Sequence, residues 1–193
     1  MNPLSSILSA FGLSTAAGLN AYIPLLTVGL VARYTDLIHL QAPYDLLANP
    51  YVLLIIAVLA LIDFVGDKIP AIDSALHAVG LVVSPVAGAI LFLATNSTTG
   101  SVSPVLAAIC GLILAGSAHT ARATARPLAT ATTGGIANPV ISIFEDSAAL
   151  VLSALAVVLP FVAFVLVLLF AVLMVLLLRR VLRRRAERRD GRM

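Results

Sequence analysis

A long uncharged stretch near the C-terminus constrains the fold of this chain more than any other feature. The 32 residues from Ser147 to Leu178 carry no charged side chain. One helix of that length would extend about 48 Å, whereas the hydrocarbon core of a membrane is about 30 Å thick. Two helices fit instead, with a turn at Leu159–Pro160, where the proline interrupts helical hydrogen bonding. Because 61% of all residues are hydrophobic and only 11% are charged, we predict an integral membrane protein.

Four further apolar segments precede this pair of helices. We predict spans at about 3–32, 51–68, 71–94 and 104–125, a fifth from about 136, and a sixth after the turn. Pro127 should end the fourth span, and a polar loop should follow up to Thr133. The predicted fold is therefore an all-α bundle of six transmembrane helices over residues 1–178, followed by a basic tail at 179–193.

Two of the predicted helices contain residues that interrupt helical structure. Gly18, Asn20 and Pro24 lie near the middle of the first span, and residues 134–139 of the fifth include two glycines and a proline. We predict that the first and fifth helices are interrupted at these places. Backbone groups that are released inside a membrane must bond to neighbouring helices or line a cavity, so a break can form part of a site. A tolerated proline kink, with Asn20 bonded to the next helix, is the alternative.

Basic residues indicate which side of the membrane each loop occupies, because short cytoplasmic loops collect lysine and arginine. Eight arginines lie between Arg179 and Arg192, and Lys68, Arg122 and Arg126 fall on the same side of a six-span model. We therefore predict a multi-pass protein of the cell inner membrane with both termini in the cytoplasm. The arginine-rich tail should contact anionic headgroups of the inner leaflet. Membrane lipids are the expected partners and nucleic acid is not, while association into a homo-oligomer stays open.

Polar and ionisable side chains fall in the cytoplasmic halves of the predicted helices. Glu145 and Asp146 are adjacent in the fifth span, where a buried charge costs roughly 3 kcal/mol or more. The predicted ion- or substrate-binding residues are Asn20, Asp63, Asp67, Asp73, His77, His119, Arg122, Asn138, Glu145 and Asp146. If they converge at one level, they form a polar chamber within an apolar bundle.

Simpler structural roles stay open for most of these residues. Asp67 could form a solvated pair with Lys68, and Asp73 could cap a helix. The histidines could be packed rings, and Arg122, like Arg126, could contact lipid headgroups. A functional role is favoured for Glu145, Asp146 and Asp63. Two adjacent carboxylates in a low-dielectric bundle cannot both stay charged without a cation or a basic neighbour. Otherwise at least one of them should hold a proton near neutral pH. We expect them to form a cation- or proton-binding centre, with Arg122 at its cytoplasmic mouth or neutralising one carboxylate.

Three ordered segments resemble a known family. They are Gly18-Leu-Asn-Ala-Tyr-Ile-Pro24, Asp67-Lys-Ile-Pro-Ala-Ile-Asp73 and Gly134-Gly-Ile-Ala-Asn-Pro-Val-Ile-Ser-Ile-Phe-Glu-Asp146, which are similar to signature segments of the bacterial integral membrane proteins of domain-of-unknown-function family 4126. The resemblance covers nearly the whole chain up to the arginine tail. It implies a polytopic inner-membrane protein without an established substrate. A glutamate is common in the family where this chain has Asp63, which keeps the charge but shortens the reach.

The pattern of acids favours a transporter or a channel-like protein for a small ion, solute or lipid. A structural or accessory membrane subunit and a metal-dependent membrane enzyme acting on lipid stay open as alternatives. Asp63 and Asp67 resemble half of a metal-binding phosphotransferase site, but the companion residues are missing. The sequence also lacks the His-Glu-x-x-His and Gly-x-Ser-x-Gly motifs. An enzyme is therefore less favoured, and the expected ligand is a cation or proton, with no organic cofactor implied.

Overall fold

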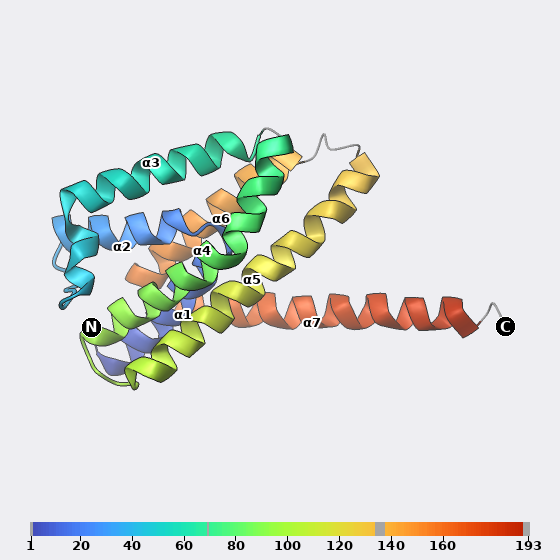
Figure 1. Cartoon of the computed structure of the whole chain (residues 1–193). Helices are drawn as coiled ribbons and strands as arrows, with labels where there is room; N and C mark the ends of the chain where they lie inside the picture. Colours follow the sequence, from blue (N-terminus) through green and yellow to red (C-terminus); the bar gives the residue numbers. More distant parts are fainter. Residues whose placement is uncertain (1, 69, 134–137, 191–193) are drawn as a thin grey trace.

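The computed structural model describes residues 2–68, 70–133 and 138–190, and all regular structure within these ranges is helical (Figure 1). The elements are α1 (Pro3–Leu19), α2 (Tyr22–Tyr34), the short 3-10 helix η1 (Tyr44–Ala48), α3 (Pro50–Gly66), α4 (Pro70–Ser97), α5 (Pro104–Thr133), α6 (Asn138–Val158) and α7 (Pro160–Asp190). Five of the α-helices begin with proline. The first turn needs no intrahelical N–H donor, and the fixed φ of proline suits a helix. The predicted all-α fold is confirmed.

Some of the described helices have the length and composition of membrane-spanning segments. Three are long and apolar enough to cross a membrane: Ala75–Ser97 of α4, Pro104–Thr124 of α5, and α6. The other apolar helices, α1, α2, α3 and the first part of α7, are shorter. Large apolar side chains also cover the outside of the bundle, with Leu54 63% exposed and Phe144 75% exposed. Such a surface is suited to lipid rather than to water, and it identifies a membrane protein.

The predicted break in the first span is present at Asn20 and Ala21. α1 ends at Leu19 and α2 begins at Tyr22. Asn20 has an extended backbone, with φ −148° and ψ 122°. Its side-chain Oδ1 accepts hydrogen bonds from the backbone N–H groups of Tyr22 (2.9 Å) and Ile23 (3.2 Å). Asn20 therefore caps α2, and the prediction of an interrupted first helix is confirmed.

α1 and α2 form a hairpin whose tip lies inside the bundle. Ser6 in the first turns of α1 donates a hydrogen bond of 2.6 Å to the carbonyl oxygen of Thr95, near the end of α4. α2 returns toward the same end of the bundle, where Gly29 packs against Leu47 of η1. The tip at Asn20 points into the interior, between α3 and α6, where it bonds to side chains of both helices.

This hairpin differs from the single crossing that the sequence predicted. α1 has 17 residues and α2 has 13, so each lies at or below the shortest length that spans a hydrocarbon core. The extended break between them lets the chain turn back instead of crossing. In Figure 1 the start of α1 and the end of α7 lie on opposite sides of the bundle. The six-span count and the shared side predicted for both termini are therefore not confirmed.

Two other predicted boundaries have different outcomes. α5 continues through Pro127 to Thr133, so the predicted stop and polar loop are wrong. A proline removes one backbone hydrogen bond, and the remaining turns of this 30-residue helix are sufficient to hold it. The turn at Leu159–Pro160 is confirmed, since α6 ends at Val158 and α7 begins at Pro160. An irregular start of the fifth span was predicted for residues 134–139. Residues 134–137 lie outside the described residues, and Asn138 and Pro139 are the first two residues of α6.

The basic tail continues the last helix. α7 runs past the boundary predicted at residue 178 and ends at Asp190. Its C-terminal part extends away from the other helices (Figure 1). The arginines that this part carries are therefore held on a helix that leaves the apolar bundle.

α4 and α5 pack closely along a stripe of small residues. Gly80, Ser84 and Gly88 repeat every four residues in α4. A Cβ on Gly80 would lie 2.6 Å from Cε1 of His119, and one on Gly88 would lie 2.6 Å from the carbonyl oxygen of Gly111. Carbon atoms do not approach so closely, so the stripe is what permits the contact. It places His119 of α5 directly against α4.

Candidate functional site

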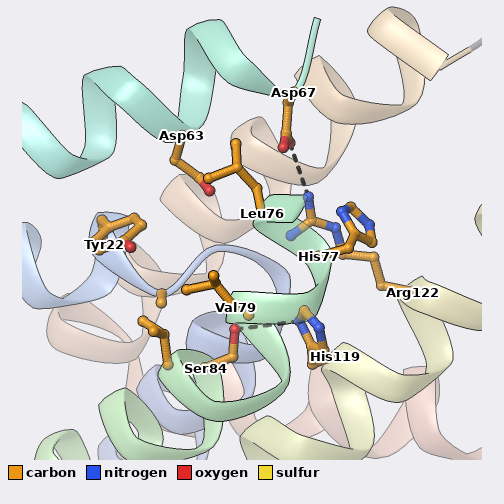
Figure 2. Close-up of a pocket in the computed structure, with 12 residues that line it drawn as sticks. Tyr22, Asp63, Asp67, Leu76, His77, Val79, Ser84, His119 and Arg122 are labelled. Carbon is orange, nitrogen blue, oxygen red and sulfur yellow. Dashed lines mark hydrogen bonds and ion pairs between the residues drawn. The ribbon is translucent and has the colours of Figure 1, made fainter. Parts of the chain in front are cut away.

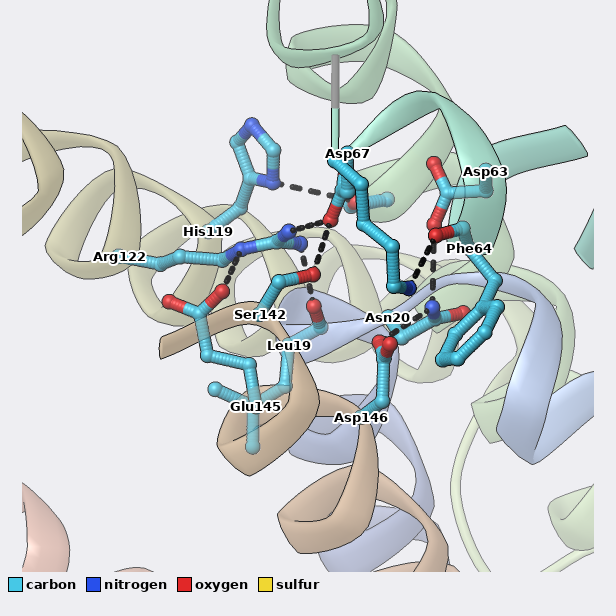
Figure 3. Close-up of polar contacts among 12 residues, drawn as sticks. Leu19, Asn20, Asp63, Phe64, Asp67, His119, Arg122, Ser142, Glu145 and Asp146 are labelled. Atoms are coloured by element: carbon cyan, nitrogen blue, oxygen red, sulfur yellow. Dashed lines mark hydrogen bonds and ion pairs between the residues drawn. The ribbon is translucent and has the colours of Figure 1, made fainter. Parts of the chain in front are cut away.

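Polar side chains from the α1–α2 break, α3, α5 and α6 meet inside the bundle (Figure 3). We call this set the polar centre, and it consists of Asn20, Asp63, Asp67, Arg122, Ser142, Glu145 and Asp146. All except Asp63, which is half-buried, are less than one-tenth exposed. Ionisable groups in such a place lose their hydration, so their stability depends on their partners.

Arg122 joins three other elements. Its Nε donates to Oε2 of Glu145 at 2.7 Å, and its Nη2 donates to Oδ2 of Asp67 at 3.0 Å. Its Nη1 donates to the carbonyl oxygen of Leu19, the last residue of α1. Carbonyls at the end of a helix have no intrahelical donor and carry partial negative charge. Arg122 therefore neutralises two carboxylates and also satisfies the backbone at the helix break.

Ser142 is a member of the polar centre that the sequence did not reveal. Its Oγ donates a hydrogen bond of 2.8 Å to Oδ2 of Asp67, and the residue is fully buried. Ser142 lies three residues before Glu145 and four before Asp146 on α6, so the three share a helical face. This helical spacing from the two acids was the sequence feature that could have indicated Ser142 as part of the site.

Asn20 holds two carboxylates from different helices. Its Nδ2 donates to Oδ2 of Asp63 at 3.0 Å and to Oδ1 of Asp146 at 2.9 Å. The orientation of the amide is fixed, because its oxygen faces two backbone N–H donors of α2 and its NH2 group must then face the acids. The N-terminus of α2, which carries partial positive charge, lies next to the Asn20 side chain.

The polar centre contains more acidic than basic groups. Its members include the four acids Asp63, Asp67, Glu145 and Asp146 and one base, Arg122, which bonds to Asp67 and Glu145. Oδ2 of Asp146 is buried and has no hydrogen-bond partner among the described residues. A proton or a small cation bound there would offset the excess of negative charge.

The predicted alternative of a solvated Asp67–Lys68 pair does not match the geometry. Asp67 is only 3% exposed and faces Arg122. The Lys68 ammonium donates to the carbonyl oxygen of Phe64 at 2.7 Å and lies 3.1 Å from the centroid of the Phe64 ring. Asp67 is thus a buried member of the polar centre, while Lys68 is on the surface.

The two histidines lie beside the polar centre on α4 and α5 (Figure 2). The ring centroids of His77 and His119 are 6.1 Å apart. Nδ1 of His119 is 3.3 Å from Oγ of Ser84, with the donor set by the tautomer of the ring. Both histidines, with Tyr22 and Asp63, line a cavity of about 20 Å³. This volume accommodates one water molecule or one small ion.

The remaining predicted site residues are placed less fully. Asn138 begins α6 and is half-buried. Asp73 is in the first turns of α4, and its side chain lies outside the described part of the structure. The same holds for Arg126 of α5, for which a lipid contact was the simpler role. Across the residues that are described, no group of three or more His, Cys, Asp or Glu side chains is arranged to hold a metal ion.

Comparison with known proteins gives a family match over most of the chain. A family model described as Domain of unknown function (DUF4126) matches residues 7–180. No curated protein and no solved structure matches the sequence. The matched region includes every residue of the polar centre and ends within α7.

Proposed function

We propose a transport function for this chain, which belongs to the family described as Domain of unknown function (DUF4126): it binds a proton or a small monovalent cation at the polar centre and moves it across the membrane. The observation that carries this proposal is the sharing of one amide nitrogen, Nδ2 of Asn20, by Asp63 and Asp146. Carboxylates inside a membrane are costly, and they commonly mark ion or proton pathways.

The interrupted α1–α2 hairpin supports this function by providing partial charges that a continuous helix would not expose. The positive N-terminus of α2 lies next to Asp63 and Asp146, while the negative C-terminus of α1 meets Arg122. A cation bound between the two carboxylates would compete with the Asn20 amide for their oxygens. Because Asn20 also caps α2, ion occupancy would change the geometry of the break, which gives ion binding a way to bias conformation.

Access to the site is supported by the cavity in Figure 2. Asp63 is half-buried and lines this cavity, whereas Asp146 is 8% exposed and does not. A proton or ion would therefore reach Asp63 first and Asp146 second. His77, His119 and a water in the cavity are suited to exchanging protons with Asp63.

We place the end of the bundle that carries Lys68, Arg179 and Arg180 in the cytoplasm of a multi-pass inner-membrane protein, because cytoplasmic loops collect basic residues. The arginines of α7 then contact anionic headgroups of the inner leaflet. A reporter fused after Met193 should be cytoplasmic, and reporters at the N-terminus and near Ala42 should both be external. A reporter at the N-terminus on the same side as one after Met193 would contradict the hairpin and restore the six-span model.

Ion flux in liposomes tests the function. We expect Asp63→Asn and Asp146→Asn each to reduce proton or sodium flux by at least about tenfold, because each removes half of the ion-binding pair. Separate gradients of pH and of sodium identify the ion. Asp36→Asn is the matched control, since Asp36 is an exposed acid in the loop after α2. Full flux in both site variants, or no flux of either ion through the native protein, would rule the function out.

A structural or accessory subunit is the second candidate, and the network around Arg122 favours it. Arg122 ties α5 to α1, α3 and α6 through three hydrogen bonds. A subunit of this kind would move no ion by itself and would co-purify with a partner in mild detergent. Its acid variants would lose thermal stability instead of losing a flux.

A further inference from the structure

A second cavity lies between α1, α5, α6 and α7. Its volume is about 450 Å³, within the range of sites that bury most of a small ligand. Most of its lining is apolar, including Leu152, Val167 and Phe170. The charged members of the lining are Arg122 and Glu145, and Arg122 also lines the small cavity beside the polar centre. We call this larger cavity the lateral groove.

The lateral groove faces lipid. Phe144, Val151 and Leu166 contribute to its lining and are 75%, 57% and 43% exposed. Because these side chains are large and apolar, the opening between them is suited to the hydrocarbon of the membrane and not to water. A ligand in the groove would therefore enter sideways from the bilayer.

The groove has a charged end and an apolar end. Along α6, Glu145 lies at the charged end, and Ala148 and Leu152 follow on the same face at helical spacing. This direction leads from the end of the bundle that carries Lys68 toward its middle. A lipid of the adjacent leaflet has the same polarity, with its headgroup at the surface and its chains directed inward.

Arg122 has N–H donors beyond those that bond to protein groups. A guanidinium has five N–H groups, and three of those on Arg122 donate to Glu145, Asp67 and the Leu19 carbonyl. Nη1 and Nη2 each carry a second hydrogen, and neither of these forms a hydrogen bond to a described residue. Arginine binds phosphate through paired N–H groups of this kind. A molecule with both an apolar chain and a phosphate would match both ends of the groove.

We infer that the lateral groove is a binding site for a phospholipid, with one acyl chain along α6 and α7 and the phosphate at Arg122. The inference rests on the apolar lining, the lateral opening and the remaining N–H donors of Arg122. It does not depend on ion transport. The carboxylate of Glu145 then has two cationic neighbours, the guanidinium and any amine that the headgroup carries.

Photo-crosslinking of the whole protein in phosphatidylcholine vesicles tests this site. The probe is a phosphatidylethanolamine with a diazirine near the middle of one acyl chain. We expect labelling of α6 and α7 at the groove to exceed, by about fivefold or more, that of Leu54 and Leu61 on α3, which are 63% and 61% exposed. A diacylglycerol with the same chain and no phosphate should show no such preference.

A groove-filling variant provides the matched comparison. Ala148→Trp should remove the preferential labelling, whereas Leu54→Trp on α3 should leave it unchanged. Thermal melting checks folding, and Val151→Trp at the rim serves as a second variant if Ala148→Trp does not fold. The chain has no native tryptophan, so the fluorescence of each variant reports on the new side chain alone.

Several results would overturn the lipid site. Equal labelling of the groove and of α3, or labelling that both filling variants leave intact, would indicate only the lipid that surrounds any membrane protein. Equal labelling by diacylglycerol would show that the phosphate does not contribute to binding in the groove. A crosslink between two copies through α6 would show that a second chain covers the groove. Preferential labelling without any ion flux would support the lipid site while refuting the transport function.

Discussion

Arg122→Met should lower the free energy of unfolding by about 3–5 kcal/mol, because it leaves two buried carboxylates without their counter-charge. Asp67 and Glu145 are 3% and 9% exposed, so water cannot replace the lost guanidinium. The carbonyl of Leu19 at the end of α1 would also lose its donor. Unfolding of the purified protein in mild detergent with increasing denaturant measures the change.

A neutralised variant separates the loss of charge balance from the loss of packing. Arg122→Met combined with Asp67→Asn and Glu145→Gln removes the guanidinium and both carboxylate charges, so it should recover most of the lost stability. Asn at residue 67 still offers an oxygen to Ser142. Arg33→Met is the control for arginine removal, because Arg33 is exposed and donates to a backbone carbonyl, that of Ala48. A single Arg122→Met variant as stable as Arg33→Met would contradict a buried ion-pair network.

Asn20→Leu should lower the free energy of unfolding by about 3 kcal/mol, since it removes two different kinds of contact. The cap of α2 contributes about 1 kcal/mol, and hydrogen bonds to charged groups contribute about 1.5–3 kcal/mol each. The loss should be smaller than their sum, because the side chain is replaced by an apolar group in a site that can relax. Denaturant unfolding and thermal melting both measure it.

Asn20→Asp distinguishes the two roles of Asn20. The new carboxylate still accepts from the backbone of α2, but it cannot donate to Asp63 or Asp146 and it adds another negative charge. We expect Asn20→Asp to destabilise the protein, and we expect Asn20→Asp with Asp146→Asn to recover part of the loss, because the amide and the acid then exchange places. Native stability in Asn20→Asp would show that the bonds to the acids contribute little.

The sequence predicts the positions of the chain breaks better than their direction. Gly18, Asn20 and Pro24 locate the interruption of the first helix, and Pro160 locates the last turn, because these residues act through local backbone geometry. Whether the chain continues across the membrane or turns back at Asn20 depends on contacts between distant residues, such as that of Ser6 with Thr95. Both courses expose apolar side chains to lipid, so hydropathy does not separate them.

The composition of the candidate site is predictable in part for the same reason. Charged residues in an apolar chain are conspicuous, and Asp63, Asp67, Arg122, Glu145 and Asp146 all stand out in the sequence. Their pairing depends on how the helices are rotated and how far apart they lie, which the sequence does not state. A buried serine such as Ser142 is ordinary in composition and becomes significant only through its bond to Asp67.

Infrared difference spectroscopy of the protein in lipid tests most directly whether Asp63 and Asp146 bind a proton or a cation. Spectra recorded between two pH values, and with and without sodium, distinguish protonated carboxyls from free and cation-bound carboxylates. We expect a carboxyl or carboxylate band that changes with proton or sodium concentration in the native protein and in Asp36→Asn. The band should be absent from Asp146→Asn. Identical difference spectra for the native protein and Asp146→Asn would contradict an ion-binding site at the helix break.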